Sequence, residues 1–300
     1  MSAQWKLDQQ YADVMQNHPY GIALYRPLRF SIFNPGSCGY FDDNGSWNPI
    51  VHLEDREMLA RKGLSEMKDE IEKAPVDSGI KWGPLTSENT RATKVELSGG
   101  IDPAPGIPVS ASAVYSYSTD KNVGAVLLTS SPITNTHYYH ASPFKNWCKK
   151  NALAILQRWP EVKEHGIWVV TSTHSTKKCA INMWSGRGRG FKVGFDADVA
   201  GIGKAGPNGE WYRCQTDEGW GEYTTEGDDM SVVFFGGLKF QYTWRFGTHL
   251  QPTKTDKLRG DEDEFRDVIA VVPDPENDQA SFEVDCEEYL AGDGEADDET

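Results

Sequence analysis

Few residues in this chain have the types and spacing that catalysis requires. The chain contains neither a G-x-S-x-G elbow, which would expose a reactive serine, nor an H-E-x-x-H zinc pair. Gly201–Gly206 matches the G-x-G-x-x-G pattern that holds a dinucleotide at a helix start, but Pro-Asn-Gly at 207–209 predicts a turn there. Only their proximity in the chain links His174 and Cys179 as a dyad. We therefore expect neither an enzyme nor a cofactor.

The cysteines also give no sign of a metal site. No CxxC pair is present, and neither His137 nor His140 stands at ligand spacing from a cysteine. An odd number of scattered cysteines is typical of free thiols in a reducing compartment. We predict free thiols and no metal for the five cysteines, Cys38, Cys148, Cys179, Cys214 and Cys286.

Net charge is distributed very unevenly along the chain. Residues 256–300 contain 18 acidic and 3 basic residues, so they carry the entire formal net charge of −15. The preceding 255 residues hold 27 acidic and 27 basic residues and are neutral overall. A neutral body with an acidic appendage indicates a tail that screens some surface, although a tail that only adds solubility remains an alternative.

Hydrophobic patterning excludes two classes of protein. The longest apolar runs, Val123–Thr129 and Val232–Leu238, are far shorter than the roughly 20 residues of a membrane-spanning helix. Residues 1–10 lack the apolar stretch of a secretory signal. We expect neither a helical membrane protein nor signal-directed secretion, and a cytoplasmic location for the inactive protein.

Two groups of cations could contact an anionic surface. Arg187, Arg189 and Lys192 lie in a glycine-spaced segment between predicted strands, where an ordinary exposed turn is the alternative. Lys145, Lys149 and Lys150 lie on a predicted helix beside aromatic residues, where a solvated helix face is the alternative. The neutral body argues against nucleic-acid binding.

Two segments alternate apolar and hydroxyl-bearing residues with period two. They are Val109–Ser118 and Ile167–Ser175, each close to the roughly 9–11 residues of a membrane-spanning strand. In lipid such strands must close into a barrel, whereas in a water-soluble protein they are half-buried sheet strands. The candidate membrane-inserting residues, including two from the following strand, are Val109, Ala111, Tyr115, Tyr117, Ile167, Val169, Phe191 and Val193.

The remaining pattern predicts an α+β fold with a large, twisted, mostly antiparallel sheet and flanking helices. Charged amphipathic spacing indicates helices over 54–73 and 143–158, and residues 1–18 form a short helix or loose arm. Strands flanking Asn44-Gly45 predict a hairpin. Two β regions span 80–134 and 166–244, without the alternation of strands and helices that builds a parallel sheet.

The order of these pieces over residues 20–246 resembles the pore-forming N-terminal domain of gasdermins. Ile167-Trp-Val-Val-Thr171 after a helix, Ser175-Thr-Lys-Lys178, Phe191-Lys-Val193, Gly201-Ile-Gly203 and Ser231-Val-Val-Phe-Phe235 carry the resemblance. Tyr20–Tyr25, Pro35-Gly36, Gly39–Phe41 and the short C-terminal region look like the fungal gasdermin-like cell-death proteins.

This resemblance implies a membrane pore-forming executioner of regulated cell death. Soluble copies would bind acidic phospholipids, assemble as a homo-oligomer and open a β-barrel pore in the plasma membrane or another cellular membrane. Pyroptosis-like innate immunity and fungal heterokaryon incompatibility are the settings of such proteins. Family lipid contacts fall here on Arg26 and Arg29, besides the two cation groups above.

The resemblance and the charge distribution together predict autoinhibition. We divide the chain into a pore-forming domain (1–246), a linker (247–264) and a short acidic inhibitory tail (265–300). Proteolysis in the linker would release the tail, and the candidate cleavage region includes Phe246, Lys254, Lys257 and Arg259. A variant partner protein is an alternative trigger. A lectin-like binding module with a solubilising tail and a secreted β-pore toxin remain alternative functions.

Overall fold

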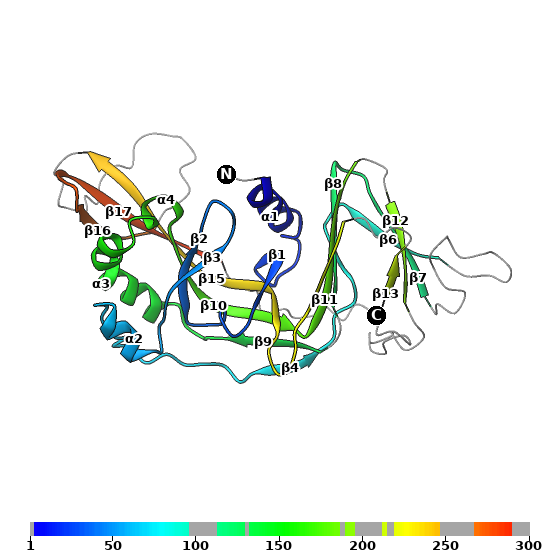
Figure 1. Cartoon of the computed structure of the whole chain (residues 1–300), viewed down its shortest axis with the longest axis horizontal. Coiled ribbons are helices and arrows are strands. Elements are labelled where there is room, and N and C mark those ends of the chain that lie inside the picture. Colours follow the sequence, from blue (N-terminus) through cyan, green and yellow to red (C-terminus); the bar gives the residue numbers. More distant parts are fainter. Residues whose placement is uncertain are drawn as a thin grey trace.

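The computed structural model describes residues 3–95, 113–129, 132–186, 190–195, 212–214, 219–246 and 267–289 (Figure 1). Within these ranges the helices are α1 (Ala3–Val14), α2 (Arg56–Arg61), α3 (Ser142–Arg158) and α4 (Val162–His165). The strands are β1 (Ile22–Arg29), β2 (Ser37–Phe41), β3 (Trp47–His52), β4 (Asp77–Ile80), β5 (Leu85–Thr86), β6 (Thr90–Val95), β7 (Ala113–Thr119), β8 (Val123–Thr129), β9 (Ile133–His137), β10 (Ile167–Thr176), β11 (Lys178–Ser185), β12 (Gly190–Phe195), β13 (Tyr212–Cys214), β14 (Trp220–Thr224), β15 (Ser231–Phe246), β16 (Asp267–Asp274) and β17 (Asn277–Tyr289).

A central sheet organises the molecule. Within the described ranges it has nine strands, in the order β16-β17-β15-β10-β2-β3, with β1 beside β15 and with β9 and β4 continuing from β10. Helices α3 and α4 cover one face, where Phe144, Ile155, Val169 and Phe240 belong to the largest apolar cluster. Burial of this face stabilises the sheet, because each large apolar side chain removed from water contributes about 1.5–3 kcal/mol.

Two smaller sheets lie at the opposite end of the molecule from α3 (Figure 1). Among the described residues each has four strands, in the orders β14-β11-β8-β5 and β13-β12-β7-β6. The two sheets pack through a cluster that includes Tyr117, Val126, Leu128, Ala180 and Val193. We call this cluster the intersheet core.

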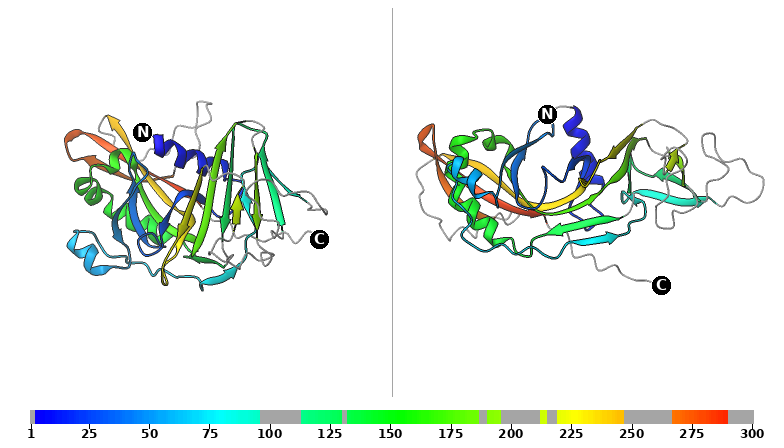
Figure 2. Two further views of the ribbon diagram at one scale, coloured as in Figure 1. Left: turned by 45° about the vertical axis from the view of Figure 1, so that its right-hand side comes forward. Right: turned by 60° about the horizontal axis from the view of Figure 1, so that its bottom comes forward.

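Four long passes of chain run through all three sheets, the first and third outward from the central sheet and the second and fourth back toward it. They are β4-β5-β6, β7-β8-β9, β10-β11-β12 and β13-β14-β15. In each sheet the second pass pairs with the first and the third, and the fourth lies outside the third. The whole is one antiparallel four-pass array that is bent between the sheets, and its long curve is visible in Figure 2.

Helix α1 packs against β1 and places Tyr11 and Met15 in a second apolar cluster with Phe234 of β15. This confirms the short N-terminal helix. In the part of the chain that the structure describes, no helix is long and apolar enough to cross a membrane.

The structure confirms most predicted elements and corrects one. The hairpin around Asn44-Gly45 is β2-β3, and the second helix is α3, beginning one residue before Pro143. The helix predicted over 54–73 is wrong beyond α2: Gly63 has φ of +64°, which ends the helix. Met67 and Ile71 still pack on the main core, but from irregular chain.

Candidate functional site

The second and third passes hold one continuous register across the bend between the two smaller sheets. Val123 of β8 lies opposite Ser185 of β11. Ser118 of β7, five residues before Val123, lies opposite Gly190 of β12, five residues after Ser185. The equal offsets mean that the register is unchanged. The described backbone at the bend agrees, because the Gly186 amide donates to the Asn122 carbonyl oxygen at 2.9 Å. The two layers are therefore one folded ladder.

The outer passes lack this continuity. Between the first and second passes the pairing shifts by three residues, from Leu85 opposite Leu127 to Thr90 opposite Thr119. Between the third and fourth passes it shifts by five residues, from Asn182 opposite Trp220 to Val193 opposite Cys214. The central pair is thus the part of the array that could straighten with every pairing kept.

Side chains in the intersheet core are withdrawn from water. Tyr117, Val126, Leu128 and Val193 have 0% exposure. Burial, and then the neighbouring Tyr115 hydroxyl, raise the pKa of Tyr117 far above its ordinary value. The intersheet core therefore holds the two smaller sheets together by apolar packing.

The predicted membrane-inserting residues divide between this array and the main body. Tyr115, Tyr117 and Val193 belong to or pack against the intersheet core, and Phe191 pairs with Tyr117. Ile167 and Val169 lie instead in the main core on β10. The expected hydroxyl-bearing face of β10 is also buried, because this central strand is covered on both faces. Val109 and Ala111 lie outside the described residues.

The acidic C-terminal region contributes a β-hairpin, β16-β17, to the central sheet. Strand β17 pairs with β15 over ten residues, from Gly237 opposite Tyr289 to Phe246 opposite Ala280. Phe282 and Val284, with 5% and 1% exposure, enter the main core beside α3. The hairpin is therefore integrated with the body by both backbone pairing and apolar packing.

Two lysines of the body form ion pairs with acidic residues of this hairpin. Lys145 on α3 lies 3.2 Å from Glu288 and 3.8 Å from Asp267. Lys163 on α4 lies 3.3 Å from Glu276 and 3.6 Å from Asp274. These contacts join α3 and α4 to both strands and the turn of the hairpin.

The same charge pairing continues along β15. Arg245 Nε donates to Glu283 at 3.0 Å, and Lys239 lies opposite Glu287. Burial lowers the pKa of Lys239 despite the Glu287 charge. Burial also acts to lower the pKa of Lys145, but the hydrogen bond and charge of Glu288, with Cys286 and Asp267, raise it above its ordinary value.

The other predicted lipid contacts have different surroundings. Lys149, Lys150 and Arg29 are exposed. Arg26 binds Asp8 of α1 through Nε at 3.2 Å and through a second nitrogen at 2.5 Å, so in this conformation it joins α1 to β1. Lys192 lies in β12 opposite Ser116.

Of the candidate cleavage region the structure describes one residue, and several other predicted residues lie outside the described ranges. Phe246 ends β15 and pairs with Ala280. Outside the described residues lie the two arginines of the glycine-spaced segment, the G-x-G-x-x-G match and three residues of the candidate cleavage region, namely Arg187, Arg189, Gly201–Gly206, Lys254, Lys257 and Arg259.

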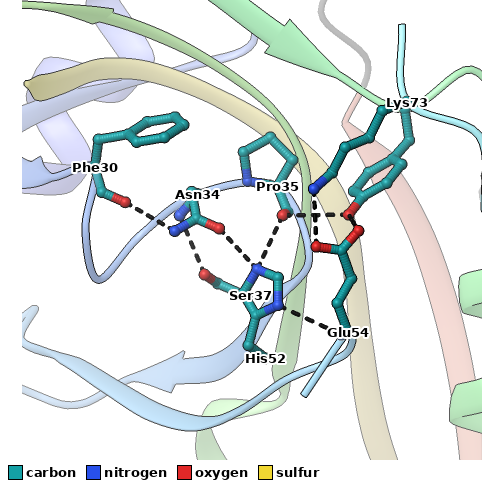
Figure 3. A network of polar contacts seen from close by, with 8 residues as sticks. Phe30, Asn34, Pro35, Ser37, His52, Glu54 and Lys73 are labelled. Carbon is teal, nitrogen blue, oxygen red and sulfur yellow. Dashed lines mark hydrogen bonds and ion pairs between the residues drawn. The ribbon is translucent and has the colours of Figure 1, made fainter. Parts of the chain in front are cut away.

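Sequence reasoning missed a polar network around His52 at the end of β3 (Figure 3). His52 Nε2 faces the Asn34 Oδ1 at 2.7 Å and the Pro35 carbonyl oxygen at 3.1 Å, so it donates. His52 Nδ1 accepts from the Glu54 amide at 3.4 Å. Both ring nitrogens are engaged, and burial lowers the pKa of His52, so the ring serves as a neutral structural link.

Glu54 completes this network. It accepts from Lys73 Nζ at 2.8 Å and from the Tyr138 hydroxyl at 3.0 Å. Burial acts to raise the pKa of Glu54, but Lys73 and Tyr138 hold it below its ordinary value. The network ties β3 to the segment before β4, and its charged members are paired with one another, so its arrangement is structural.

The suggested His174–Cys179 dyad is also unsuited to nucleophilic chemistry. Burial, with the nearby His137, lowers the pKa of His174 to about 4. Burial raises the pKa of Cys179 to about 12. Both groups are neutral near pH 7, and His174 packs against Tyr20 and Trp82 at ring distances of 5.0 and 5.4 Å. A reactive thiolate would need the opposite shift of the cysteine pKa.

A groove of about 1150 Å³ lies beside α1, β1 and β15. Its lining includes Trp168, with Lys239 Nζ 5.6 Å from the ring centre, and Tyr289 at the end of β17. Both Trp47 and Trp168 in this lining are less than a tenth exposed, so neither offers an open stacking face.

Comparisons with known sequences and structures do not identify a family for this chain. No protein-family model and no curated protein sequence matches this chain. Among solved structures, one similar chain comes from "Cryo-EM structure of the Gasdermin A3 membrane pore". The two chains share 10% identity, and the match covers 78% of this chain and 88% of that chain with a TM-score of 0.26. At that score most of the two backbones do not superpose, so the function of this chain is argued from its own strands and charges.

Proposed function

We propose that this chain forms membrane pores by opening its bent four-pass array into longer strands. The observation that carries the proposal is the continuous register of the second and third passes, in residues 113–129, 178–186 and 190–195. Each pass exceeds the roughly 9–11 residues that span a bilayer as a strand. Straightening the central ladder would keep its neighbours, so no pairing has to be exchanged.

The membrane supplies the driving force in this proposal. Opening the intersheet core in water would expose its side chains, which costs the free energy of their burial. These side chains include Tyr117, Val126, Leu128 and Val193. At a bilayer the freed apolar side chains can contact lipid instead. Backbone groups must be hydrogen-bonded inside lipid, and a ladder shared between neighbouring copies in a ring meets that requirement.

The acidic hairpin and the cations fit a role in control. Anionic lipid attracts each nearby Lys or Arg by about 1 kcal/mol. Lys145 and Lys163 form ion pairs with hairpin carboxylates, whereas Lys149 and Lys150, on the same helix as Lys145, are exposed. We propose that acidic phospholipid is the membrane partner and that the hairpin restrains pore formation until the linker is cut or a variant partner protein displaces it.

The wider role follows from the same proposal. A pore of this kind would end the life of a cell, as in regulated, pyroptosis-like death, without any catalysed reaction. The inactive protein would reside in the cytoplasm and the active homo-oligomer in a cellular membrane. The sequence resemblance to fungal gasdermin-like proteins supports this setting.

A lectin-like module is the weaker candidate. Stacking on a sugar needs open aromatic faces. Trp47, Trp82, Trp147 and Trp168 are all less than a tenth exposed, and Trp244, at 51%, lies on β15 away from the groove lining. These four buried tryptophans therefore favour packing over sugar binding.

Dye release from vesicles tests the proposal. The full chain, with a protease recognition sequence placed between residues 254 and 259, is folded and then cut. We expect release from vesicles containing acidic phospholipid after the cut, and little release before it or from neutral vesicles. A cut, folded chain that binds vesicles without releasing dye would refute pore formation. Equal release before and after the cut would refute restraint by the hairpin.

A further inference from the structure

One edge of β15 is occupied by two different segments. Strand β1 pairs with its first part, from Arg29 opposite Ser231 to Ile22 opposite Phe235. Strand β17 pairs with the remainder, residues 237–246, while β10 takes the other edge as far as Phe240. Undocking of β16-β17 would therefore open ten consecutive residues of this edge.

The part of β15 that β17 covers has a composition with high β-strand propensity. Residues 237–246 read Gly-Leu-Lys-Phe-Gln-Tyr-Thr-Trp-Arg-Phe, which combines aromatic residues with period-two alternation. Leu238, Phe240 and Tyr242 are anchored in the main core, so the strand would stay in place when the hairpin leaves. An open, anchored edge with unpaired N–H and C=O groups is a template for another strand.

This edge lies on the outer side of the whole array. Among the described residues, β14 pairs with β11 and β13 pairs with β12, and neither has a partner on its outer side. The fourth pass is therefore closed on its outer side only along β15, by β1 and β17. In a ring of copies, neighbouring arrays meet along this side, and the docked hairpin stands between them.

We infer that the C-terminal hairpin caps the β15 edge and that a second copy of this chain takes its place there. This inference rests on the proposed function and specifies how copies meet. Two β15 edges do not suit one another, because Lys239 and Arg245 would face like charges across a two-fold axis. The edge of one copy instead meets the opposite side of the next, a head-to-tail contact that can close into a ring.

Hydrogen exchange in solution tests the inference without a membrane. The full-length triple variant E283K/E287K/E288K places cations opposite Arg245, Lys239 and Lys145. Loss of the ion pairs of Arg245 and Lys145, and of the cross-strand charge pair of Lys239, predicts about 10- to 100-fold faster exchange of the β17-facing amides of residues 237–246 in dilute protein. At high concentration we expect larger particles by mass photometry and renewed protection of the same amides. The matched control D293K/E295K/D297K makes the same change in net charge beyond β17 and should behave like the original chain.

Two results would overturn the inference. One is a variant that stays monomeric at every concentration with its 237–246 amides exchanging. The other is an oligomer in which those amides remain unprotected. If the triple variant does not fold, judged by exchange of β8 and β11, the cut full-length chain is measured in the same way. Dye release is measured separately. Renewed protection of these amides without dye release would refute the proposed pore formation and leave the proposed interface supported.

Discussion

Replacing Phe282 by alanine should undock the C-terminal hairpin selectively. Phe282 is 5% exposed, and it lies 6.4 Å from Tyr242 between ring centres with Lys163 Nζ 5.5 Å from its own ring centre. Removing a buried phenylalanine side chain costs about 3–5 kcal/mol. Since these contacts join β17 to the body, most of that loss falls on docking. A factor of ten per 1.36 kcal/mol then raises the undocked population by roughly a hundredfold to a few thousandfold.

Native-state hydrogen exchange measures this effect directly. Those amides of residues 237–246 that face β17 should exchange faster by that factor, while the amides of β8 and β11 keep their rates. Phe282→Leu conserves most of the volume, costs less than about 1.5 kcal/mol and should accelerate exchange by no more than about tenfold. An equal increase in all three strands would mean that the hairpin unfolds only with the whole molecule, and the reasoning would fail.

Three further outcomes test the charges and the buried histidine. Lys145→Glu should weaken hairpin docking by about 1 kcal/mol in the same exchange assay, and Lys149→Glu, at an exposed position on the same helix, should not. In a double-mutant cycle on urea unfolding, Arg26→Ala and Asp8→Ala should show a coupling of about 0.5–1 kcal/mol, and zero coupling would contradict the bidentate contact. The pKa of His174, about 4 when folded against 6.5 when unfolded, means that the unfolded state binds the proton more readily. Its contribution is complete above pH 6.5 and falls by about 3 kcal/mol as the pH drops to 4. His174→Phe should flatten that part of the stability profile, and an unchanged slope would count against the burial argument.

Local patterns in the sequence predicted the individual elements well. Alternation and turn residues located β7, β8 and the β2-β3 hairpin, because these signals depend on neighbours a few residues apart. The helix over 54–73 failed for a tertiary reason. Met67 and Ile71 meet the main core from irregular chain, so their burial mimics helical spacing without requiring a helix.

The arrangement of the four passes could not be predicted from the sequence. Nothing local indicates that β10 is covered on both faces, since Ser172, Thr173 and Ser175 are polar residues that the body buries. Nor does composition reveal that β8-β11 and β7-β12 share a register across a bend. Both facts depend on contacts between segments that are 35 residues or more apart in the sequence.

The acidic tail shows what charge arithmetic can and cannot supply. The count correctly located an excess of negative charge after residue 255 that could screen another surface. It could not reveal that Val272, Phe282 and Val284 complete the main core. A segment that is both acidic and part of the core cannot leave at the cost of its ion pairs alone, because its apolar burial must also be replaced.

That double attachment bears on the order of events in the proposed mechanism. Lys145 cannot pair with Glu288 and with a lipid phosphate at once, whereas Lys149 and Lys150 are exposed while the hairpin is docked. First contact with an acidic membrane therefore needs no release of the hairpin and can use these exposed lysines. Release then frees Lys145, Lys163 and the edge of β15 together, because the same two strands cover all three. Lipid binding and assembly of copies would be coupled through one displaced element, without any separate signal between the two sites.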